Sequence, residues 1–471
     1  MTDTFYWYDL ETTGVDPKWD RIVQFAGFRT DTELQQVGEA HSFYIRLPDD
    51  VLPNPDATLV TGITPDLLAR EGRSEAQALK EINDIFSEPG TCVVGYNNLR
   101  FDDEFMRYGL YRNLFDPYSR EWRDGNSRWD LIDLVRATGA LRREGITWPQ
   151  DENGLPVYKL EALTQANGLE HGQAHDALSD VHATVAMARL IKQAQPKLFS
   201  YYYEIRQKKK VRALLEPYGA RLLVHVTGMY PRERYGMAPI LSLGRHPSNA
   251  NSIIVADLAQ DIEPLLNGHE DALREALFTK GDHPRPGLKE IKVNRCPFVA
   301  PIDVLDVEHF ETLGVTLREV KERARRLKQP YVAQKIRRLY TQEQQKPPAD
   351  PDAALYAAFL QDEDRARCRQ LRRDLETNCW QDMDFNDTRL RTLAARLKAR
   401  SYDPLMSEAE RAEWREFVIH KLTAEGEWLN LEKYLNRLDE LDQGSPTAEH
   451  QALITHLRDH ASYLKHSYSL T

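Results

Sequence analysis

Residues 5–14 of this 471-residue chain read FYWYDLETTG. Aromatic residues favour β-strands, so the run predicts a strand that ends near Asp9. Side chains two positions apart on a strand point to the same face, and Asp9 and Glu11 can therefore share one site. The turn at residues 12–14 offers backbone N–H groups beside them. Carboxylate oxygens are hard ligands that suit Mg²⁺ or Mn²⁺, so the stretch predicts a metal site at the end of a strand.

Two further motifs carry acidic residues that would complete such a site. Residues 97–102 read NNLRFD and follow a short apolar strand, which places Asp102 at the same end of the sheet. Residues 175–180 read HDALSD and open an Ala-rich helix, with Asp180 in its first turns and His175 at its entry. A histidine can act as a general base because its ordinary pKa lies near neutrality. Two hard cations held roughly 3.5–4 Å apart can hydrolyse a phosphodiester, so the pattern indicates a nuclease.

Taken singly, each motif has an ordinary structural explanation. An Asp-x-Glu pair is usually a solvated strand end, and Asn-x-x-Phe-Asp is usually a turn into a helix. Their occurrence together and in this order favours a shared site. Asp103, Glu104 and Asp176 are interpreted as solvated residues near the positive end of a helix dipole, not as ligands. His171 and His182 are the rival histidines, and His182 should point to a different side of its helix.

The three motifs resemble those of the DEDDh exonucleases, and the match extends to the bacterial exonuclease I family. It is carried by GYNNLRFDDE at residues 95–104, NSRWDL at residues 126–131 and the long C-terminal extension. The resemblance implies an α/β fold with an RNase H-like exonuclease core, a central SH3-like β domain and an all-helical C-terminal domain. It also implies 3′→5′ degradation of single-stranded DNA to 5′-mononucleotides by two-metal-ion hydrolysis, in DNA repair and recombination.

The resemblance assigns roles to individual residues of the site. Asp9, Glu11, Asp102 and Asp180 would be catalytic carboxylates that bind two Mg²⁺ ions, with Mn²⁺ as an alternative. His175 would be the general base. None of these five residues departs from the family pattern.

We expect three domains, at residues 1–195, 196–349 and 350–471. In the first, strand and helix patterns alternate, with strands at residues 22–29 and 42–47. The second has four short apolar runs separated by turn residues, typical of a small β domain, and then a basic helical stretch. The third is helical, with almost no strand signal. The four short runs lie at residues 222–226, 240–243, 252–256 and 291–293.

Charge is distributed unevenly over these domains, although the whole chain has a net charge of −11. The first has 19 Lys and Arg against 32 Asp and Glu, and the third has 17 against 23. The middle domain has 26 against 18 and is therefore basic. A basic segment in an acidic protein is the expected track for a phosphate backbone.

Composition is that of an ordinary soluble protein. The resemblance implies a cytoplasmic bacterial protein associated with the nucleoid, and we expect a monomer. No apolar run approaches the ~20 residues of a membrane span, and no signal peptide is evident. The four cysteines lack metal-ligand spacing and are interpreted as reduced packing residues. They are Cys92, Cys296, Cys368 and Cys379.

Single-stranded DNA is expected to be held by cationic and aromatic side chains together. Tyr118 and Trp122 lie in a loop-like segment and are the candidate base platforms, and Lys159 stands where the resemblance suggests an arginine. Lysine keeps the charge but lacks the two-pronged donor of arginine. The full set of expected substrate contacts is Glu11, Thr12, Arg107, Tyr118, Trp122, Arg136, Lys159, Tyr201 and Lys208.

A second basic feature suggests a protein partner. Residues 318–338 contain nine Lys and Arg against two Glu. The resemblance implies docking of the acidic C-terminal tail of the single-stranded DNA-binding protein, and arginines would pair with its carboxylates. The same run also fits a plain DNA track or a solvated helix face. The expected partner contacts are Arg142, Tyr201, Arg325 and Arg326.

Three alternative functions remain open at this point. An RNA-trimming exoribonuclease of the ribonuclease T type shares the motifs, but such enzymes are short single-domain chains. A non-catalytic protein that binds single-stranded nucleic acid would be favoured by loss of a ligand carboxylate, and none is lost. A scaffold that uses its C-terminal helices to bind partners would not consume substrate.

Overall fold

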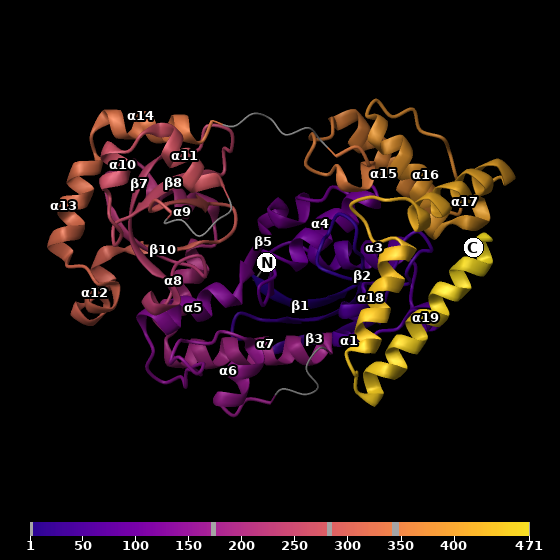
Figure 1. The fold of residues 1–471 in the computed structure, drawn as a ribbon, viewed down its shortest axis with the longest axis horizontal. Coiled ribbons are helices and arrows are strands. Elements are labelled where there is room, and N and C mark those ends of the chain that lie inside the picture. Colours follow the sequence, from indigo (N-terminus) through magenta and orange to yellow (C-terminus); the bar gives the residue numbers. More distant parts are fainter. Residues whose placement is uncertain (1–2, 171–175, 280–284, 342–347, 471) are drawn as a thin grey trace. The chain divides into compact units, whose positions relative to one another are not determined.

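The computed structural model describes residues 3–170, 176–279, 285–341 and 348–470 (Figure 1). Its contacts divide the chain into two compact units. The first consists of Met1–Ser127, Gly172–His182 and Lys346–Thr471, and the second of Arg128–His171 and Ala183–Gln345. The C-terminal helices therefore belong to the same compact unit as the N-terminal segment.

A five-stranded sheet of order β3-β2-β1-β4-β5 runs through the N-terminal part of the chain. Its strands are β1 (Thr4–Thr12), β2 (Ile22–Thr30), β3 (Gln36–Tyr44), β4 (Thr91–Gly95) and β5 (Ser127–Asp130). The central strand β1 pairs antiparallel with β2 and parallel with β4, so it is covered on both edges. The strand predicted at residues 22–29 is confirmed. The one predicted at 42–47 instead begins at Gln36, because its largely exposed first half has little apolar signal, and it ends at Tyr44.

Two helices pack on this sheet through an aromatic core that includes Tyr8 and Phe86. They are α3 (Glu75–Phe86) and α4 (Asp102–Arg112). Ser74 caps the start of α3, because its hydroxyl accepts a hydrogen bond from the Gln77 backbone N–H. Further helices of the N-terminal part are α1 (Pro55–Thr61), α2 (Pro65–Glu71) and α7 (Ala177–Ala194).

Helices of the C-terminal part complete the first unit, and α19 lies beside α18, α1 and α2 (Figure 1). They are α15 (Asp362–Glu376), α16 (Thr388–Ser401), α17 (Glu408–Thr423), α18 (Leu431–Gln443) and α19 (Ala448–Tyr468). Apolar residues of α15 and α16 share one core with Tyr108 and Tyr111 of α4. The helical prediction for this region is confirmed.

Four buried ionic side chains, the arginine–carboxylate cluster, join the two ends of the chain within this unit. The cluster consists of Arg21, Asp50, Asp352 and Arg400. Arg400 contacts Asp50 at 2.7 Å and Asp352 at 2.6 Å, and Arg21 contacts Asp352 at 3.5 Å. Each of these side chains is at most 4% exposed, so the pairs are shielded from solvent.

The second unit contains an antiparallel sheet of order β10-β6-β7-β8-β9. Its strands are β6 (Leu222–Val226), β7 (Met237–Arg245), β8 (Ser252–Asp257), β9 (Leu288–Lys292) and β10 (Phe298–Pro301). Its other helices are α5 (Leu131–Leu141), α6 (Leu160–Ala166), α8 (Pro196–Ile205), α9 (Lys208–Leu215), α10 (Glu263–Asn267), α11 (Glu270–Phe278), α12 (Val307–Leu313), α13 (Leu317–Leu327) and α14 (Pro330–Leu339).

The predicted strands of this domain coincide with β6 to β9, although the run at 291–293 belongs to a strand that begins at Leu288. Strand β10 was not predicted, since it has only four residues and ends in a proline. Helices α10 and α11, which lie between two strands of the predicted β region, were not predicted either.

Three cysteines are packing residues, as predicted, but Cys379 is exposed. The structure records all four as free thiols. None of the helices within the described residues combines the length and apolar character needed to cross a membrane.

Candidate active site

Three carboxylates converge where β1 ends and α7 begins. Ligand oxygens of Asp9, Glu11 and Asp180 all lie within 4.8 Å of one another. Asp9 pairs with Ala26 and Glu11 with Gln24 in the β1–β2 ladder, so the strand fixes both side chains on one face. We call these three residues the acidic group. Their spacing is what the strand-and-helix analysis predicted for Asp9, Glu11 and Asp180.

Asp102 lies close enough to influence this group electrostatically. It is the first residue of α4 and only 4% exposed. Burial is the main cause that raises the pKa of Asp9 well above its ordinary value, and Asp102 is the next. Burial, followed by Asp180 and Asp102, raises the pKa of Glu11 to about 8. The oxygens of Asp102 are not among those that converge within 4.8 Å in the described part of the chain.

The chemistry of the acidic group fits a divalent cation. Its donors are all carboxylate oxygens, which hard cations prefer, and they are held together despite mutual repulsion. A bound cation would reverse the local electrostatics and restore ordinary acidity to these carboxyls. The raised pKa values of Asp9 and Glu11 therefore reflect burial and the negative charges gathered at this site.

The predicted general base, His175, lies outside the described residues, as does His171. The third histidine, His182, packs its ring on Phe28 of β2 with 4.7 Å between ring centroids. Asp176 is exposed at the start of α7, as predicted, and it also caps this helix by accepting a hydrogen bond from the Ser179 backbone N–H at 3.2 Å.

Two carboxylates next to Asp102 were predicted to be solvated, and this prediction was wrong. Asp103 is fully buried, and it accepts hydrogen bonds from Arg120 at 2.8 Å and from the Tyr8 hydroxyl at 3.1 Å. Glu104 pairs with Arg107 at 2.9 Å and accepts a hydrogen bond from Tyr356. Tyr8 and Tyr356 come from distant parts of the sequence, so the local helix-start pattern could not reveal these contacts.

Family models match nearly the whole chain. A model described as "Exonuclease" matches residues 6–188, the "Exonuclease I SH3-like domain" matches 206–342, and the "Exonuclease I C-terminal domain" matches 349–464. Exodeoxyribonuclease I of Escherichia coli K12 is 41% identical over 90% of each chain.

Solved structures of exonuclease I are also similar to this chain. E. coli exonuclease I in complex with a dA16 oligonucleotide is 39% identical, with a TM-score of 0.93 over 98% of this chain and 100% of that one. A structure of "SSB/Exonuclease I in complex with inhibitor CFAM" is 38% identical, with a TM-score of 0.89 over 98% of this chain and 100% of that one.

The chain belongs to the exonuclease I family. It therefore has an exonuclease domain of the α/β class, an SH3-like domain and a helical C-terminal domain, as the sequence analysis expected. The resemblance to this family is thus confirmed over all three domains. Membership in an exodeoxyribonuclease family also identifies the acidic group as the candidate site for divalent metal use.

The residues that an exonuclease I family member is expected to use for DNA contacts lie in both compact units. In the first unit, Trp122 is 65% exposed and available for stacking, with Arg123 over its ring. Tyr118 is partly buried, and its ring packs edge-on against Phe359. Thr12 is 7% exposed and donates a hydrogen bond to the Gly14 carbonyl.

Arg107, a predicted phosphate contact, already has protein partners. Its guanidinium forms two hydrogen bonds to Glu121, at 2.8 and 3.0 Å, and a third to Glu104 at 2.9 Å. Only 7% of its side chain is exposed. Contact with a phosphate would require it to exchange one of these carboxylates, and its role in substrate binding stays a prediction.

Predicted DNA contacts in the second unit lie on several elements. Arg136 of α5 pairs with Asp133 at 3.1 Å. Lys159 caps α6 and is exposed. Tyr201 of α8 donates a hydrogen bond to the Val299 carbonyl at 2.8 Å. Burial and the nearby Arg212 and Arg245 lower the pKa of Lys208, which marks a positive local potential.

The predicted partner contacts also lie in the second unit. Arg142 ends α5 and donates a hydrogen bond to the Val304 carbonyl at 3.1 Å. On α13, Arg325 pairs with Glu322, and Arg326 pairs with Glu263. The side chain of Arg325 is 71% exposed, so this pair can yield to a competing carboxylate at little cost.

Proposed function

We propose that the chain hydrolyses single-stranded DNA from the 3′ end and releases 5′-mononucleotides. The observation that carries this proposal is the convergence of Asp9, Glu11 and Asp180 within 4.8 Å in a member of the exonuclease I family. A match across all three domains supports it over an RNA-trimming enzyme, which resembles only the exonuclease part. All four ligand carboxylates are present, which argues against a non-catalytic binding protein.

Two Mg²⁺ ions, with Mn²⁺ as an alternative, are the proposed cofactor. When bound, such ions supply an activated water and stabilise the leaving oxygen of the phosphodiester. In this proposal Asp9, Glu11, Asp102 and Asp180 hold the ions, and Thr12 and Glu11 border the terminal nucleotide. His175 removes a proton from the attacking water. The water oxygen bonds to phosphorus, the bond to the 3′ oxygen breaks, and the shortened strand keeps a 3′ hydroxyl.

The substrate strand is proposed to follow the cationic and aromatic residues named above. Trp122 supports this because its large ring is exposed, and the E. coli relative was solved with a dA16 oligonucleotide. We also propose that the acidic tail of the single-stranded DNA-binding protein docks near Arg142, Tyr201, Arg325 and Arg326. The solved complex of exonuclease I with SSB supports this partner.

Several further proposals describe the protein in its cell. We place it in the bacterial cytoplasm with the nucleoid, as a monomer that acts in DNA repair and recombination. The domain boundaries at residues 195 and 349 are also proposed. They lie close to the limits of the three matched family models.

The test follows a 5′-labelled 30-nucleotide DNA and an RNA of the same sequence, each with Mg²⁺ and with EDTA. We expect the DNA to shorten stepwise from its unlabelled end only when Mg²⁺ is present, and the RNA to persist. Chromatography of the small products should give 5′-mononucleotides. Equal loss of RNA, or loss of DNA in EDTA, would contradict the proposal.

A further inference from the structure

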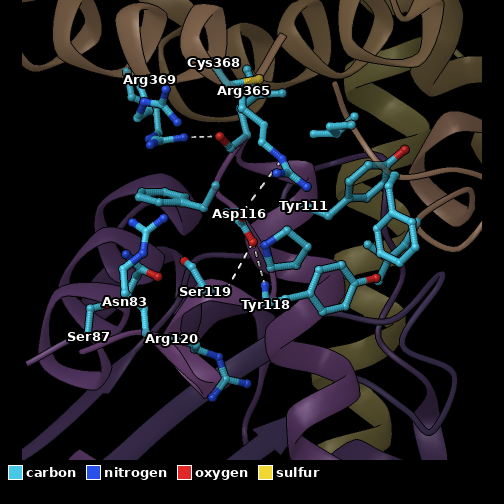
Figure 2. Close-up of a pocket in the computed structure, with 18 of the residues that line it drawn as sticks. Asn83, Ser87, Tyr111, Asp116, Tyr118, Ser119, Arg120, Arg365, Cys368 and Arg369 are labelled. Carbon is cyan, nitrogen blue, oxygen red and sulfur yellow. Dashed lines mark hydrogen bonds and ion pairs between the residues drawn. The ribbon is translucent and has the colours of Figure 1, made fainter. Parts of the chain in front are cut away.

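A cavity of about 270 Å³ lies between the segment Asp116–Asn126 and helix α15, entirely within the first compact unit. Figure 2 shows Arg365 and Arg369 on one side of it and Asp116, Tyr118 and Ser119 on the other. The acidic group contributes no residue to its lining. We call this space the α15 cavity.

Five arginines line the α15 cavity, against two carboxylates. The arginines are Arg120, Arg123, Arg365, Arg369 and Arg372, and the carboxylates are Asp116 and Asp124. Arginine is a preferred residue for phosphate because its planar guanidinium can donate two parallel hydrogen bonds. This excess of positive charge therefore favours an anionic ligand.

Two of the five arginines are neutralised by protein carboxylates. Arg120 pairs with Asp103 at 2.8 Å, and both side chains are fully buried. Arg365 pairs with Asp362 at 3.3 Å and lies 3.9 Å from Asp116. Asp116 is further engaged by two backbone N–H groups, from Tyr118 and Ser119.

The other three arginines have no ion pair among the residues that the structure describes. Arg372 donates a hydrogen bond to the Leu114 carbonyl and lies 4.1 Å over the ring of Phe115. A carbonyl and a ring leave its full charge in place. Burial lowers the pKa of Arg372, which shows that water compensates this charge poorly. Arg123 and Arg369 add exposed guanidinium groups to the same lining.

The α15 cavity also has an aromatic part. Phe359 lines it and is 74% exposed, an unusual position for a large apolar side chain. Its ring lies at 63° to that of Tyr118, with 6.0 Å between centroids, and its exposure leaves most of the ring surface accessible. Open aromatic faces beside cationic groups bind nucleobases by stacking.

We propose that the α15 cavity binds a nucleoside 5′-monophosphate, with its phosphate at Arg369 and Arg372 and its base on Phe359. The volume lies just below the range of roughly 300–1,000 Å³ that is usual for small-ligand sites, and it suits one nucleotide rather than a strand. The binding step involves no hydrolysis, so it stands independently of the exonuclease proposal. The proposed ligand is a free nucleotide, and the alternative ligand is the terminal nucleotide of a DNA strand.

Isothermal titration calorimetry of the full chain in EDTA tests this site. In EDTA no cation is available to bridge a phosphate to the acidic group, so binding there is suppressed. The ligands are dAMP, inorganic phosphate, deoxyadenosine and the dinucleotide pdApdA. We expect dAMP to bind at least tenfold more tightly than phosphate or deoxyadenosine, and more tightly than the dinucleotide. Equal affinity for phosphate and dAMP, or tighter binding of the dinucleotide, would overturn the proposal.

Variants locate the binding site. Arg369→Gln combined with Arg372→Gln should weaken dAMP binding at least tenfold. The matched control is Arg373→Gln, which removes the same charge from α15 outside the cavity and should change affinity less than twofold. Phe359→Ala should weaken dAMP binding but leave phosphate binding unchanged, and its exposed position makes misfolding no explanation. Binding that survives these changes but disappears in Asp9→Asn would overturn the proposal and place the nucleotide at the acidic group.

Discussion

Two sets of carboxylates in the same compact unit, one half-buried and one fully buried, have opposite charge environments. In the acidic group, burial and neighbouring carboxylates raise the pKa of Glu11 to about 8. In the arginine–carboxylate cluster, burial alone would raise the pKa of Asp352, but Arg400 and two further arginines hold it well below its ordinary value. The two sets differ in the charges that shift their pKa values: arginines lower the pKa of Asp352, whereas carboxylates add to burial in raising that of Glu11. Carboxylates paired with arginines stabilise the fold, whereas clustered carboxylates favour a cation from solution.

The largest expected effect comes from removing one ligand of the acidic group. Asp9→Asn or Asp180→Asn should lower the rate of DNA hydrolysis by at least about 10³-fold, because a neutral amide holds a cation poorly. Circular dichroism and the unfolding midpoint should show an intact fold. The matched control is Asp176→Asn, since asparagine caps a helix as well as aspartate does. Near-normal hydrolysis by Asp9→Asn would show that the carboxylates do not act through metal.

Loss of the proposed base should have the next largest effect. His175→Ala should slow hydrolysis by roughly 10²–10⁴-fold, the usual contribution of general base catalysis. Binding of single-stranded DNA, measured by fluorescence anisotropy with Ca²⁺ in place of Mg²⁺, should stay unchanged. His182→Ala serves as the control and should be near normal, because its ring packs on Phe28. If His182→Ala were nearly inactive and His175→Ala were active, His182 and not His175 would be the general base.

Breaking the arginine–carboxylate cluster should affect stability instead of chemistry. Arg400→Met leaves Asp50 and Asp352 buried without their main partner, which costs about 3–5 kcal/mol. Urea unfolding followed by tryptophan fluorescence measures the loss. The control is Arg437→Met, whose partner Asp56 is half exposed, so a much smaller loss is expected. Similar losses of unfolding free energy in the two variants would show that burial does not determine how strongly an ion pair stabilises the fold.

Dependence on pH should distinguish the two sets. The pKa of Glu11 is raised in the folded chain, so the folded state binds more protons than the unfolded state between about pH 4.5 and 8. Stability in EDTA should therefore fall as pH rises through this window. The lowered pKa values of Asp50 and Asp352 contribute stability that is lost only below their ordinary range. Mg²⁺ should raise the unfolding midpoint more at pH 8 than at pH 5, and an equal shift would contradict this explanation.

The smallest expected effects concern the affinity for single-stranded DNA. Lys208→Gln should reduce the salt slope of single-stranded DNA affinity by about 0.7, the value for one lost phosphate contact. Its control is Lys210→Gln on the same helix, where the lysine pairs with Glu204. Trp122→Ala should weaken binding by about 1–3 kcal/mol with little change in slope, because stacking releases no ions. An unchanged salt slope in Lys208→Gln would show that the DNA backbone does not contact Lys208.

Local patterns were sufficient to predict the elements that build the acidic group. Asp9 and Glu11 are two positions apart on a strand, and Asp180 follows a helix start, so periodicity alone brings their side chains to defined places. The surroundings of Asp103 were predicted wrongly, because Arg120 and Tyr8 reach it only through tertiary packing. The same limit applies to Phe359, whose exposure beside α15 has no signature in the sequence.

The residues of the arginine–carboxylate cluster are synthesised at different times, because the ribosome makes the chain from its N-terminus. Asp50 and Arg400 are separated by 350 residues. At a translation rate of about 5–20 residues per second, Asp50 leaves the ribosome roughly 20–70 s before its partner exists. The nascent exonuclease segment must spend that interval without its final counter-charge. A ribosome that terminates before codon 400 would therefore release a chain in which Asp50 never gains this partner, so only complete synthesis yields the paired cluster.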